Sequence, residues 1–215
     1  MNPLIETISG FKEEDYYTRV NLHIHSCFSD GAMHPQEIIK KAQEYGLEYI
    51  SITDHNTANA YNHIDYGSLG ELNLITGIEF DCWYKTDFMH ILGYGIDPNN
   101  SEIQNLSAKN HNETKLDIIR IFSPRKAPAV IKVIKNAGGI AVLAHPACCW
   151  TLNPEKMVKE LVSFGLDGIE LYYPYIRHRG IFKFHSVKKF NKIAEKNKLL
   201  ITGGNDCHSC NLTHY

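Results

Sequence analysis

Short apolar runs of strand length alternate with amphipathic segments of helix length along most of this 215-residue chain. The alternation is typical of βαβ units, in which helices connect the parallel strands of one sheet. The expected strands span 20–25, 48–53, 72–80, 88–96, 139–144, 168–172 and 199–202, and the expected helices span 35–45, 99–121, 127–136, 154–164 and 181–196. No linker-like change of composition interrupts the pattern. The sequence therefore predicts one α/β domain over 1–215, either a closed or distorted barrel or an open doubly wound sheet.

Charge and motif content restrict the function further. Neither a G-x-G-x-x-G pattern nor a P-loop follows a predicted strand, so the common nucleotide-binding folds lack their fingerprint. The 22 Lys and Arg residues against 24 Asp and Glu give a formal net charge of −2. The chain thus lacks the basic excess that contacts long nucleic-acid backbones, although small or single-stranded nucleic acids stay open as ligands.

The sequence also predicts a cytoplasmic protein without a membrane segment. Residues 1–17 hold four acidic side chains and no apolar stretch of the kind that forms a secretory signal. No apolar run approaches the roughly 18 residues that a spanning helix needs. The six cysteines are scattered along a chain long enough to build its own core, which favours a reduced protein over a disulfide scaffold.

Polar residues with metal-ligand chemistry gather at the ends of the predicted strands. Histidine is the commonest metal ligand, and this chain has twelve. Predicted strands end at His23-Ile24-His25, Asp54-His55, Glu79, His145 and Asp206-Cys207-His208. Because active sites of parallel α/β folds assemble at the carboxyl ends of the strands, we expect these side chains to converge.

His90 differs from the others because it lies near the start of its predicted strand. Either this strand runs antiparallel to its neighbour, or its boundaries differ by several residues. A single buried histidine is commonly a hydrogen-bonded core residue, but six strand-linked ones are hard to explain by packing. Convergence of so many charged groups predicts a polynuclear metal site, since unpaired charges could not share that volume. Nitrogen and oxygen ligands fit Zn, Mn or Fe without choosing among them.

Four motifs occur in a fixed order along the chain. They are Leu22-His23-Ile24-His25-Ser26 with Ser29-Asp30-Gly31, Thr53-Asp54-His55, Leu143-Ala144-His145-Pro146, and Gly204-Asn205-Asp206-Cys207-His208. Together they resemble the polymerase and histidinol phosphatase (PHP) superfamily of metal-dependent phosphoesterases. Two further segments, 77–80 and 90–97, are similar to the branch that acts on nucleotides and related phosphoesters. The resemblance covers about residues 19–208.

The resemblance implies a distorted seven-stranded (β/α)7 barrel with three divalent metal ions at the carboxyl ends of its strands. By similarity, one ion is held by His23, His25, Glu79 and Asp206; Glu79 bridges to a second ion held by His90 and His145; and Asp30, His55 and His208 hold the third. Asp54 is predicted either to orient a ligating imidazole or to cap the helix that follows it.

The implied activity is hydrolysis of phosphate esters, in the EC 3.1 class. A metal cluster lowers the pKa of a bound water and neutralises the phosphoryl oxygens, so attack by a metal-bound hydroxide needs no covalent intermediate. Nucleotides or short oligonucleotides are the expected substrates; a small-metabolite phosphatase of the histidinol phosphate type and a non-catalytic PHP module are the alternatives. No membrane partner is expected, and protein partners are not indicated.

Substrate contacts are predicted in the segment that follows strand 168–172. Arg177 could bind phosphate bidentately and His178 could protonate the leaving group; the alternative for both is a solvated helix start. Arg125 is a weaker phosphate candidate and is otherwise a surface charge. In nucleotide-acting relatives an inserted cap precedes strand 139–144. Here 99–126 leaves room for little more than one helix, which predicts a more open site. The helix expected over 99–121 is most simply a solvated one.

Overall fold

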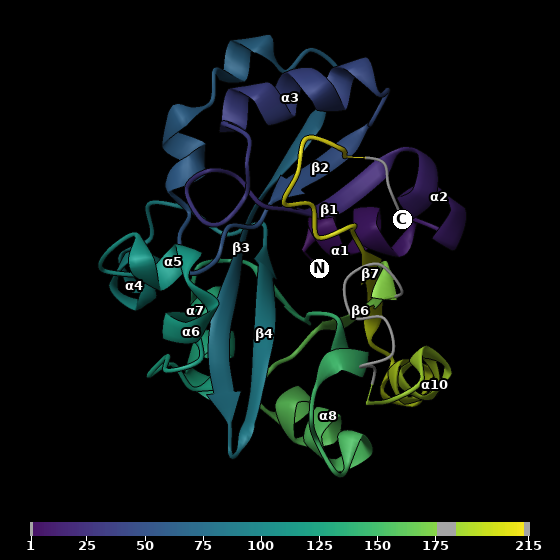
Figure 1. Cartoon of the computed structure of the whole chain (residues 1–215). Coiled ribbons are helices and arrows are strands. Elements are labelled where there is room, and N and C mark those ends of the chain that lie inside the picture. Colours follow the sequence, from purple (N-terminus) through teal and green to yellow (C-terminus); the bar gives the residue numbers. More distant parts are fainter. Residues whose placement is uncertain (1, 176–183, 213–215) are drawn as a thin grey trace.

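The computed structural model describes residues 2–175 and 184–212. Its centre is a seven-stranded sheet in which the strands follow one another in chain order (Figure 1). The strands are β1 (Val20–Ile24), β2 (Tyr49–Ile52), β3 (Asn73–Tyr84), β4 (Asp87–Tyr94), β5 (Ile140–Leu143), β6 (Gly168–Tyr172) and β7 (Leu200–Gly203). All seven predicted strands are present, and β3 continues four residues beyond its predicted end.

The direction of β4 explains the position of His90. β1, β2 and β3 are parallel, as are β5, β6 and β7, whereas β4 is antiparallel to both of its neighbours. The amino-terminal half of an antiparallel strand lies at the same rim as the carboxyl ends of the others. The antiparallel alternative was therefore correct, and a residue near the start of β4 reaches the rim that the other strands reach at their ends.

The sheet curves into a distorted barrel whose first and last strands meet through the segment after β7. β1 and β7 are not paired along their lengths, but Ile24 forms a bridge with Cys207 beyond the end of β7. His25 N donates to Cys207 O at 2.9 Å, and Cys207 N donates to His23 O at 3.2 Å. The Asn21 amide nitrogen also donates to the Asn205 side-chain oxygen at 2.7 Å. These bonds bring the last motif of the chain against the first.

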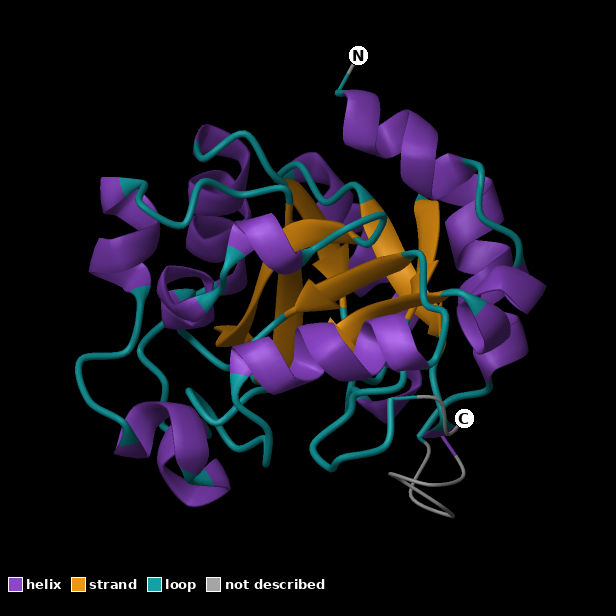
Figure 2. Ribbon diagram, turned by 90° about the horizontal axis from the view of Figure 1, so that it is seen from above, coloured by secondary structure: helices purple, strands orange, loops and turns teal. Residues whose placement is uncertain are grey.

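Helices surround the sheet (Figure 2). Four of the predicted helices are present as α3 (Pro35–Glu44), α7 (Ala127–Asn136), α8 (Pro154–Ser163) and α10 (Val187–Asn197). Three of them have proline in the first turn, where its missing N–H costs no hydrogen bond. Short 3₁₀ turns η1 (Asn59–His63), η2 (Tyr66–Ser68) and η3 (Pro146–Cys148) follow β2 and β5. No helix in the described ranges is long and apolar enough to cross a membrane.

Two short helices at the amino terminus, α1 (Pro3–Ser9) and α2 (Glu13–Thr18), were not predicted. Each is too short to show a clear helical period. They pack against β7 and β1, respectively. Their buried side chains Ile8 and Tyr16 share an apolar cluster with Leu92 and Tyr94 of β4. Because His90 lies on the same strand face as Leu92 and Tyr94, this cluster supports the strand that presents His90.

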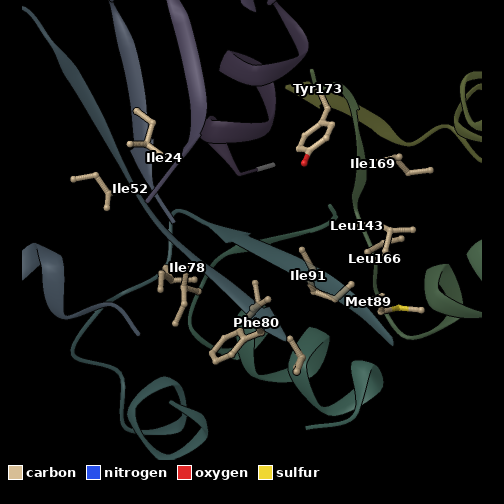
Figure 3. Packing of buried hydrophobic residues seen from close by; sticks show 14 of the residues in the cluster. Ile24, Ile52, Ile78, Phe80, Met89, Ile91, Leu143, Leu166, Ile169 and Tyr173 are labelled. Atoms are coloured by element: carbon tan, nitrogen blue, oxygen red, sulfur yellow. The ribbon is translucent and has the colours of Figure 1, made fainter. Parts of the chain in front are cut away.

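A larger apolar cluster lies between the sheet and its helices. Figure 3 shows part of it, including Ile78 and Phe80 of β3 and Ile91 of β4. Ile131 and Ile134 of α7 belong to the same cluster and are fully buried. Burial of these apolar side chains is the main source of stability for the framework that holds the rim residues.

The segment predicted as one solvated helix over 99–121 is instead three short helices, α4 (Ser101–Leu106), α5 (Asn112–Lys115) and α6 (Asp117–Arg120). Extended backbone at Ser107 and Leu116 separates them. The prediction of a fully solvated face was also wrong, because Arg120 is only 7% exposed. Polar periodicity could not show that this part of the chain folds back over the rim.

Candidate metal centre

All nine residues predicted as metal ligands lie at one rim of the barrel. They are His23 in β1, His25 and Asp30 after it, His55 after β2, Glu79 in β3, His90 in β4, His145 after β5, and Asp206 and His208 after β7. His145 and Asp206 have positive φ angles of 26° and 48°. A positive φ is uncommon for residues other than glycine, and such backbone conformations cluster at functional sites.

Glu79 occupies the centre of this group. Its Oε2 atom is 3.3 Å from His23 Nε2, 3.3 Å from His25 Nε2 and 3.2 Å from His55 Nδ1. One carboxylate oxygen thus faces three imidazole nitrogens that come from two different strand ends.

The other oxygen of Glu79 faces a second set of residues. Oε1 is 3.0 Å from His90 Nδ1 and 3.3 Å from His145 Nε2. The same two histidines approach each other, with Nδ1 of His90 3.3 Å from Nε2 of His145. A carboxylate with different imidazoles at each oxygen has the arrangement that a bridging ligand needs.

Asp206 completes one group with the two histidines of the first motif. Its Oδ1 is 3.0 Å from His25 Nε2 and 3.4 Å from His23 Nε2, and these two imidazole nitrogens are 3.1 Å apart. Tyr173 donates its hydroxyl hydrogen to the other carboxylate oxygen of Asp206 at 2.8 Å. His23, His25 and Asp206 therefore present three ligand atoms close enough to hold one ion.

Asp30 lies in another group of potential ligands. Its Oδ1 is 3.1 Å from His208 Nε2 and 3.6 Å from His25 Nδ1, and its Oδ2 is 3.7 Å from His55 Nε2. These four residues also have the spacing of a metal-binding group. Arg120 donates from Nη1 to Asp30 Oδ2 at 2.7 Å.

Several buried atoms in the cluster have no hydrogen-bond partner in the described part of the chain. They include Oε2 of Glu79, Oδ1 of Asp30 and the Nδ1 atoms of His55 and His145. Buried polar atoms are costly when left unpaired. Divalent cations would satisfy these atoms, and imidazole and carboxylate donors are the ligands that Zn, Mn and Fe accept. The residues present therefore fit a metal centre.

Two buried carboxylates that sequence reasoning missed orient the cluster. Glu170 in β6 lies 2.9 Å from His23 Nδ1 and accepts a hydrogen bond from His145 N at 3.0 Å. Asp81 in β3 lies 3.1 Å from His90 Nε2 and 3.2 Å from His55 Nδ1. Alternation along β3 could have identified Asp81, two residues after Glu79, had the strand not been predicted to end at 80.

Asp54 fulfils neither of its two predicted roles directly. Its carboxylate accepts hydrogen bonds from Ser26 N at 2.7 Å, from Ser26 Oγ at 2.5 Å and from Ser29 Oγ at 2.6 Å. The hydroxyl of Ser29 in turn lies 3.4 Å from His25 Nδ1. Asp54 thus fixes the loop after β1 and reaches His25 through Ser29.

Burial and mutual attraction shift the protonation of the metal-free cluster in opposite directions. Burial lowers the pKa of His25, but the adjacent carboxylates of Asp206 and Glu79 outweigh it and raise the pKa to about 10. Burial likewise opposes protonation of His90, but attraction by Glu79 and a hydrogen bond to Asp81 raise its pKa to about 9. The neighbouring histidines hold the pKa of Glu79 well below its ordinary value despite its burial.

We expect metal binding to release protons, and to be tighter at higher pH. The raised pKa values keep His25 and His90 protonated at pH 7 in the metal-free protein, whereas ligating imidazoles must be neutral. Fewer protons should leave as the pH rises through 9 and 10. Calorimetric titration with Zn²⁺ in buffers of different ionisation enthalpy measures this number. The exposed His63→Gln variant should match the wild type; release of no protons at pH 7 would contradict the prediction.

The pH dependence of folding stability in the metal-free protein is opposite to that of metal binding: the free energy of unfolding falls as the pH rises. Because the folded pKa values of His25 and His90 lie above the unfolded value near 6.5, their stabilisation is complete below that pH. It is lost as the pH rises through 9 and 10. Metal-free and metal-loaded protein should therefore diverge most in stability in the alkaline range.

Two adjoining cavities open at the cluster. The first has a volume of about 220 Å³. Its lining consists of Arg120, Tyr173 and eight carboxylate or imidazole side chains, seven from the ligand cluster and the eighth from Asp117. A second, of about 590 Å³, shares His90, His145, Asp117 and Arg120 with the first. Arg120 is thus the guanidinium that faces both cavities in the described part of the chain.

The substrate contacts predicted from the sequence have different outcomes. Arg177 and His178 lie outside the described residues. Arg125 is not a surface charge, because it is 7% exposed and donates from Nε to Leu106 O at 2.6 Å. It lines neither cavity. Arg120 was not predicted, since its segment was taken to be a solvated helix.

Comparison with known proteins places these observations in a family. The PHP domain model matches residues 21–143, more than half of the chain. The 5'-3' exoribonuclease Rnm of Escherichia coli is 34% identical over 89 residues, which are 40% of this chain and 30% of that protein. Phosphoribosyl 1,2-cyclic phosphate 1,2-diphosphodiesterase of Eggerthella lenta is 22% identical, over 87% of this chain and 93% of its own length. The chain thus spans less than a third of the Escherichia coli relative.

Solved structures agree on the fold. An amidohydrolase from Chromobacterium violaceum superposes with a TM-score of 0.71 at 18% identity, covering 89% of this chain and 88% of that one. A Bifidobacterium adolescentis protein assigned as a metal-dependent phosphoesterase also gives 0.71, at 19% identity, covering 92% and 89%. With the family match, the ordered motifs and the ligand cluster at the rim, the chain belongs to the PHP domain family.

Proposed function

We propose that this protein is a metal-dependent phosphoesterase that hydrolyses phosphate esters of nucleotides or short oligonucleotides. The observation that carries the proposal is the convergence of nine ligand-type side chains, Glu79 among them, at one rim of the barrel, where buried carboxylate and imidazole atoms are left without hydrogen-bond partners in the described part of the chain. The family match and the activities in the names of the relatives, an exoribonuclease and a diphosphodiesterase among them, support the reaction class.

The proposed centre holds three divalent ions of Zn, Mn or Fe. The division expected from the family assigns His23, His25, Glu79 and Asp206 to one ion, Glu79, His90 and His145 to the second, and Asp30, His55 and His208 to the third. Two of the groups of nearby ligand atoms support it, namely His23, His25 and Asp206, and Asp30, His55 and His208 together with His25. The third group joins Glu79 and His90 to His55, while His145 Nε2 lies 3.3 Å from Glu79 Oε1. Ions bound there would activate a water molecule and neutralise charge on the phosphoryl oxygens. Cytoplasmic location, expected from the cysteine content, is part of the same proposal.

The protein's own groups act on the substrate and on the ligands. Glu170 accepts a hydrogen bond from His23 Nδ1, and Asp81 Oδ1 lies 3.1 Å from His90 Nε2, so that the other nitrogen of each ring faces Glu79. Arg120 lines both cavities and supplies a guanidinium suited to phosphate oxygens. No serine or cysteine nucleophile is needed.

Nucleotide substrates are favoured by the relatives and by the site. A 3',5'-nucleoside bisphosphate phosphatase of Chromobacterium violaceum is 28% identical over 64% of this chain and 45% of its own length. The 220 Å³ cavity at the cluster is large enough for a phosphate, and the adjoining 590 Å³ leaves room for the organic part of a nucleotide.

A screen of phosphoesters with metal-reconstituted protein tests the proposal. Chelated protein is loaded separately with Mn²⁺, Zn²⁺ or Fe²⁺ and assayed with nucleoside monophosphates, dinucleotides, histidinol phosphate and bis-p-nitrophenyl phosphate. Release of phosphate and nucleosides is the expected result. Exclusive turnover of histidinol phosphate would favour the small-metabolite alternative. Absence of turnover with every metal would favour a non-catalytic module and overturn the proposal.

Replacement of Arg120 by lysine should weaken phosphate binding. Lysine keeps the charge but loses the planar pair of donors, and loss of one charged hydrogen bond corresponds to about a tenfold rise in KM. Steady-state kinetics on a nucleoside monophosphate measure the change. The matched control is Arg19→Lys, since Arg19 also pairs with carboxylates, Asp15 and Glu48, but lies at the other end of β1. Equal KM values for the two variants would remove Arg120 from the proposed site.

A further inference from the structure

Both tryptophans of the chain, Trp83 and Trp150, line the 590 Å³ cavity beside the ligand cluster. Phe88 and Phe184 line it as well. The volume lies within the range of about 300–1,000 Å³ that small-molecule sites occupy. Four aromatic rings therefore surround a space that is continuous with the candidate metal centre.

The first aromatic pair belongs to the same ribbon as the ligands. Trp83 lies opposite Phe88 in the β3–β4 pairing, and Asp81 lies opposite His90. Residues two apart on a strand share a face and are separated by about 7 Å. Phe88 accordingly contacts His90 edge to face, with ring centroids 5.3 Å apart. The aromatic surface thus begins at Phe88, about 7 Å along the strand from His90, a distance that one pentose can span.

Trp83 is held in a fixed orientation. Its indole Nε1 donates to Ile121 O at 2.9 Å, and its backbone N donates to Arg125 O at 2.9 Å. The indole N–H is therefore already used, so what this side chain can offer a ligand is its ring. A pre-oriented ring loses little conformational entropy when a planar group packs on it.

The second aromatic pair joins Trp150, in the loop after β5, to Phe184, which lies shortly before α10. The rings of Trp150 and Phe184 are in contact, with centroids 4.9 Å apart, and Phe184 N donates to Ala147 O at 3.0 Å. Trp150 is nevertheless 74% exposed and Phe184 46% exposed. Exposed aromatic groups that line a cavity mark a surface that a ligand covers.

The cavity offers few groups that could distinguish one aromatic ligand from another. Among the described lining residues, Thr86 is the one uncharged hydroxyl or amide side chain; the charged and imidazole groups lie at the end shared with the cluster. Stacking on aromatic rings tolerates every base, because each base has a π-face. The lining therefore favours ring binding without hydrogen-bond selection.

Resting on the phosphoesterase function proposed above, we propose that this cavity stacks the base of a nucleoside phosphate and does not select among bases. The phosphate lies at the cluster and Arg120, the pentose spans the step from His90 to Phe88, and the base packs among the aromatic rings. The cavity thus makes the enzyme prefer nucleotides over sugar phosphates, whichever base they carry.

Equilibrium binding to the full chain, kept metal-free with a chelator so that no ligand is consumed, tests this proposal. Calorimetry compares AMP, CMP and ribose 5-phosphate, and tryptophan fluorescence reports whether the ligand reaches the cavity. We expect AMP and CMP to bind within about threefold of each other, at least about tenfold more tightly than ribose 5-phosphate, and to change the fluorescence.

Variants test whether the aromatic side chains that line the cavity contribute to AMP binding. Trp150→Ala and Phe184→Ala should each weaken AMP binding about tenfold and leave ribose 5-phosphate binding unchanged. Leu152→Ala is the control, since Leu152 is fully exposed next to the same loop but does not line the cavity. Equal binding of AMP and ribose 5-phosphate, or unchanged AMP binding in both aromatic variants, would overturn the proposal. The proposal would also be overturned if the wild type bound no AMP but self-associated, and if Trp150→Ala abolished the self-association.

Turnover is measured separately on metal-loaded wild type, which keeps the two proposals distinguishable. Hydrolysis of phosphoesters without a preference for ring-bearing substrates overturns the cavity proposal alone. Ring-dependent binding without hydrolysis by any metal form overturns the phosphoesterase proposal alone.

Discussion

Replacing Glu79 by glutamine should remove both metal binding and activity. The two oxygens of this carboxylate face imidazoles that are presented by β1, β2, β4 and β5 or by the residues that follow them. A neutral amide removes the negative charge that the imidazoles at Oε1 and those at Oε2 share. Loss of partners that only support a ligand costs up to about 100-fold in affinity or activity, and loss of the shared ligand should exceed this. Metal content after dialysis and hydrolysis of a nucleoside monophosphate measure the effect.

Two comparisons make the result specific to the site. Glu71→Gln makes the same chemical change at an exposed position before β3 and should keep wild-type metal content and activity. Circular dichroism shows whether Glu79→Gln remains folded. A folded variant that retains the full complement of metal would contradict a bridging role for Glu79.

Replacing Gly204 by alanine should weaken the whole rim. A Cβ atom at this position would lie 2.4 Å from both the backbone N and the Cβ of His23, closer than real contacts allow. The segment after β7 would have to move away from β1 and stretch the hydrogen bonds between Cys207 and the backbone of β1. We expect a loss of about 3 kcal/mol in the free energy of unfolding, at the upper end for overpacking.

The same substitution should reduce metal affinity, because Asp206 and His208 follow directly on the displaced segment. Urea denaturation of the metal-free protein measures the stability, and calorimetric titration with Zn²⁺ measures the affinity. Gly10→Ala is the matched control: Gly10 is exposed, ends α1 with an ordinary negative φ, and an added Cβ would meet the backbone at 3.3 Å. Wild-type stability and affinity in Gly204→Ala would show that the close approach is not needed.

The strands and the ligand types could be predicted from local patterns. Apolar runs identified all seven strands, because burial on the sheet requires them wherever the strand lies. Five of the six ligand-type histidines appeared at the carboxyl ends of predicted strands, and the antiparallel direction of β4 accounts for the sixth, His90, which lies near the start of its strand. The common nucleotide-binding folds lacked their glycine motifs, which counted against them without deciding between a barrel and an open sheet.

Three kinds of information could not be obtained locally. Glu170 lies inside β6 and looks like an ordinary strand position until the fold places it beside His23, whereas Asp81 was missed because β3 was predicted to end at residue 80. The helices of the segment 101–120 are short and interrupted, so their periodicity resembled one solvated helix rather than a layer that brings Arg120 to Asp30. The first two helices were missed because each is shorter than two turns.

The sequence by itself determined that this protein is an α/β chain of the PHP type with His, Asp and Glu at the ends of its strands. Only the tertiary structure decided that Glu79 lies at their centre, that Arg120 faces the cluster, and that Trp83 and Trp150 share one cavity beside it. The physical reason is that strand patterns depend on neighbours within a few residues. The site is made by contacts across the barrel, between residues that are far apart in the chain.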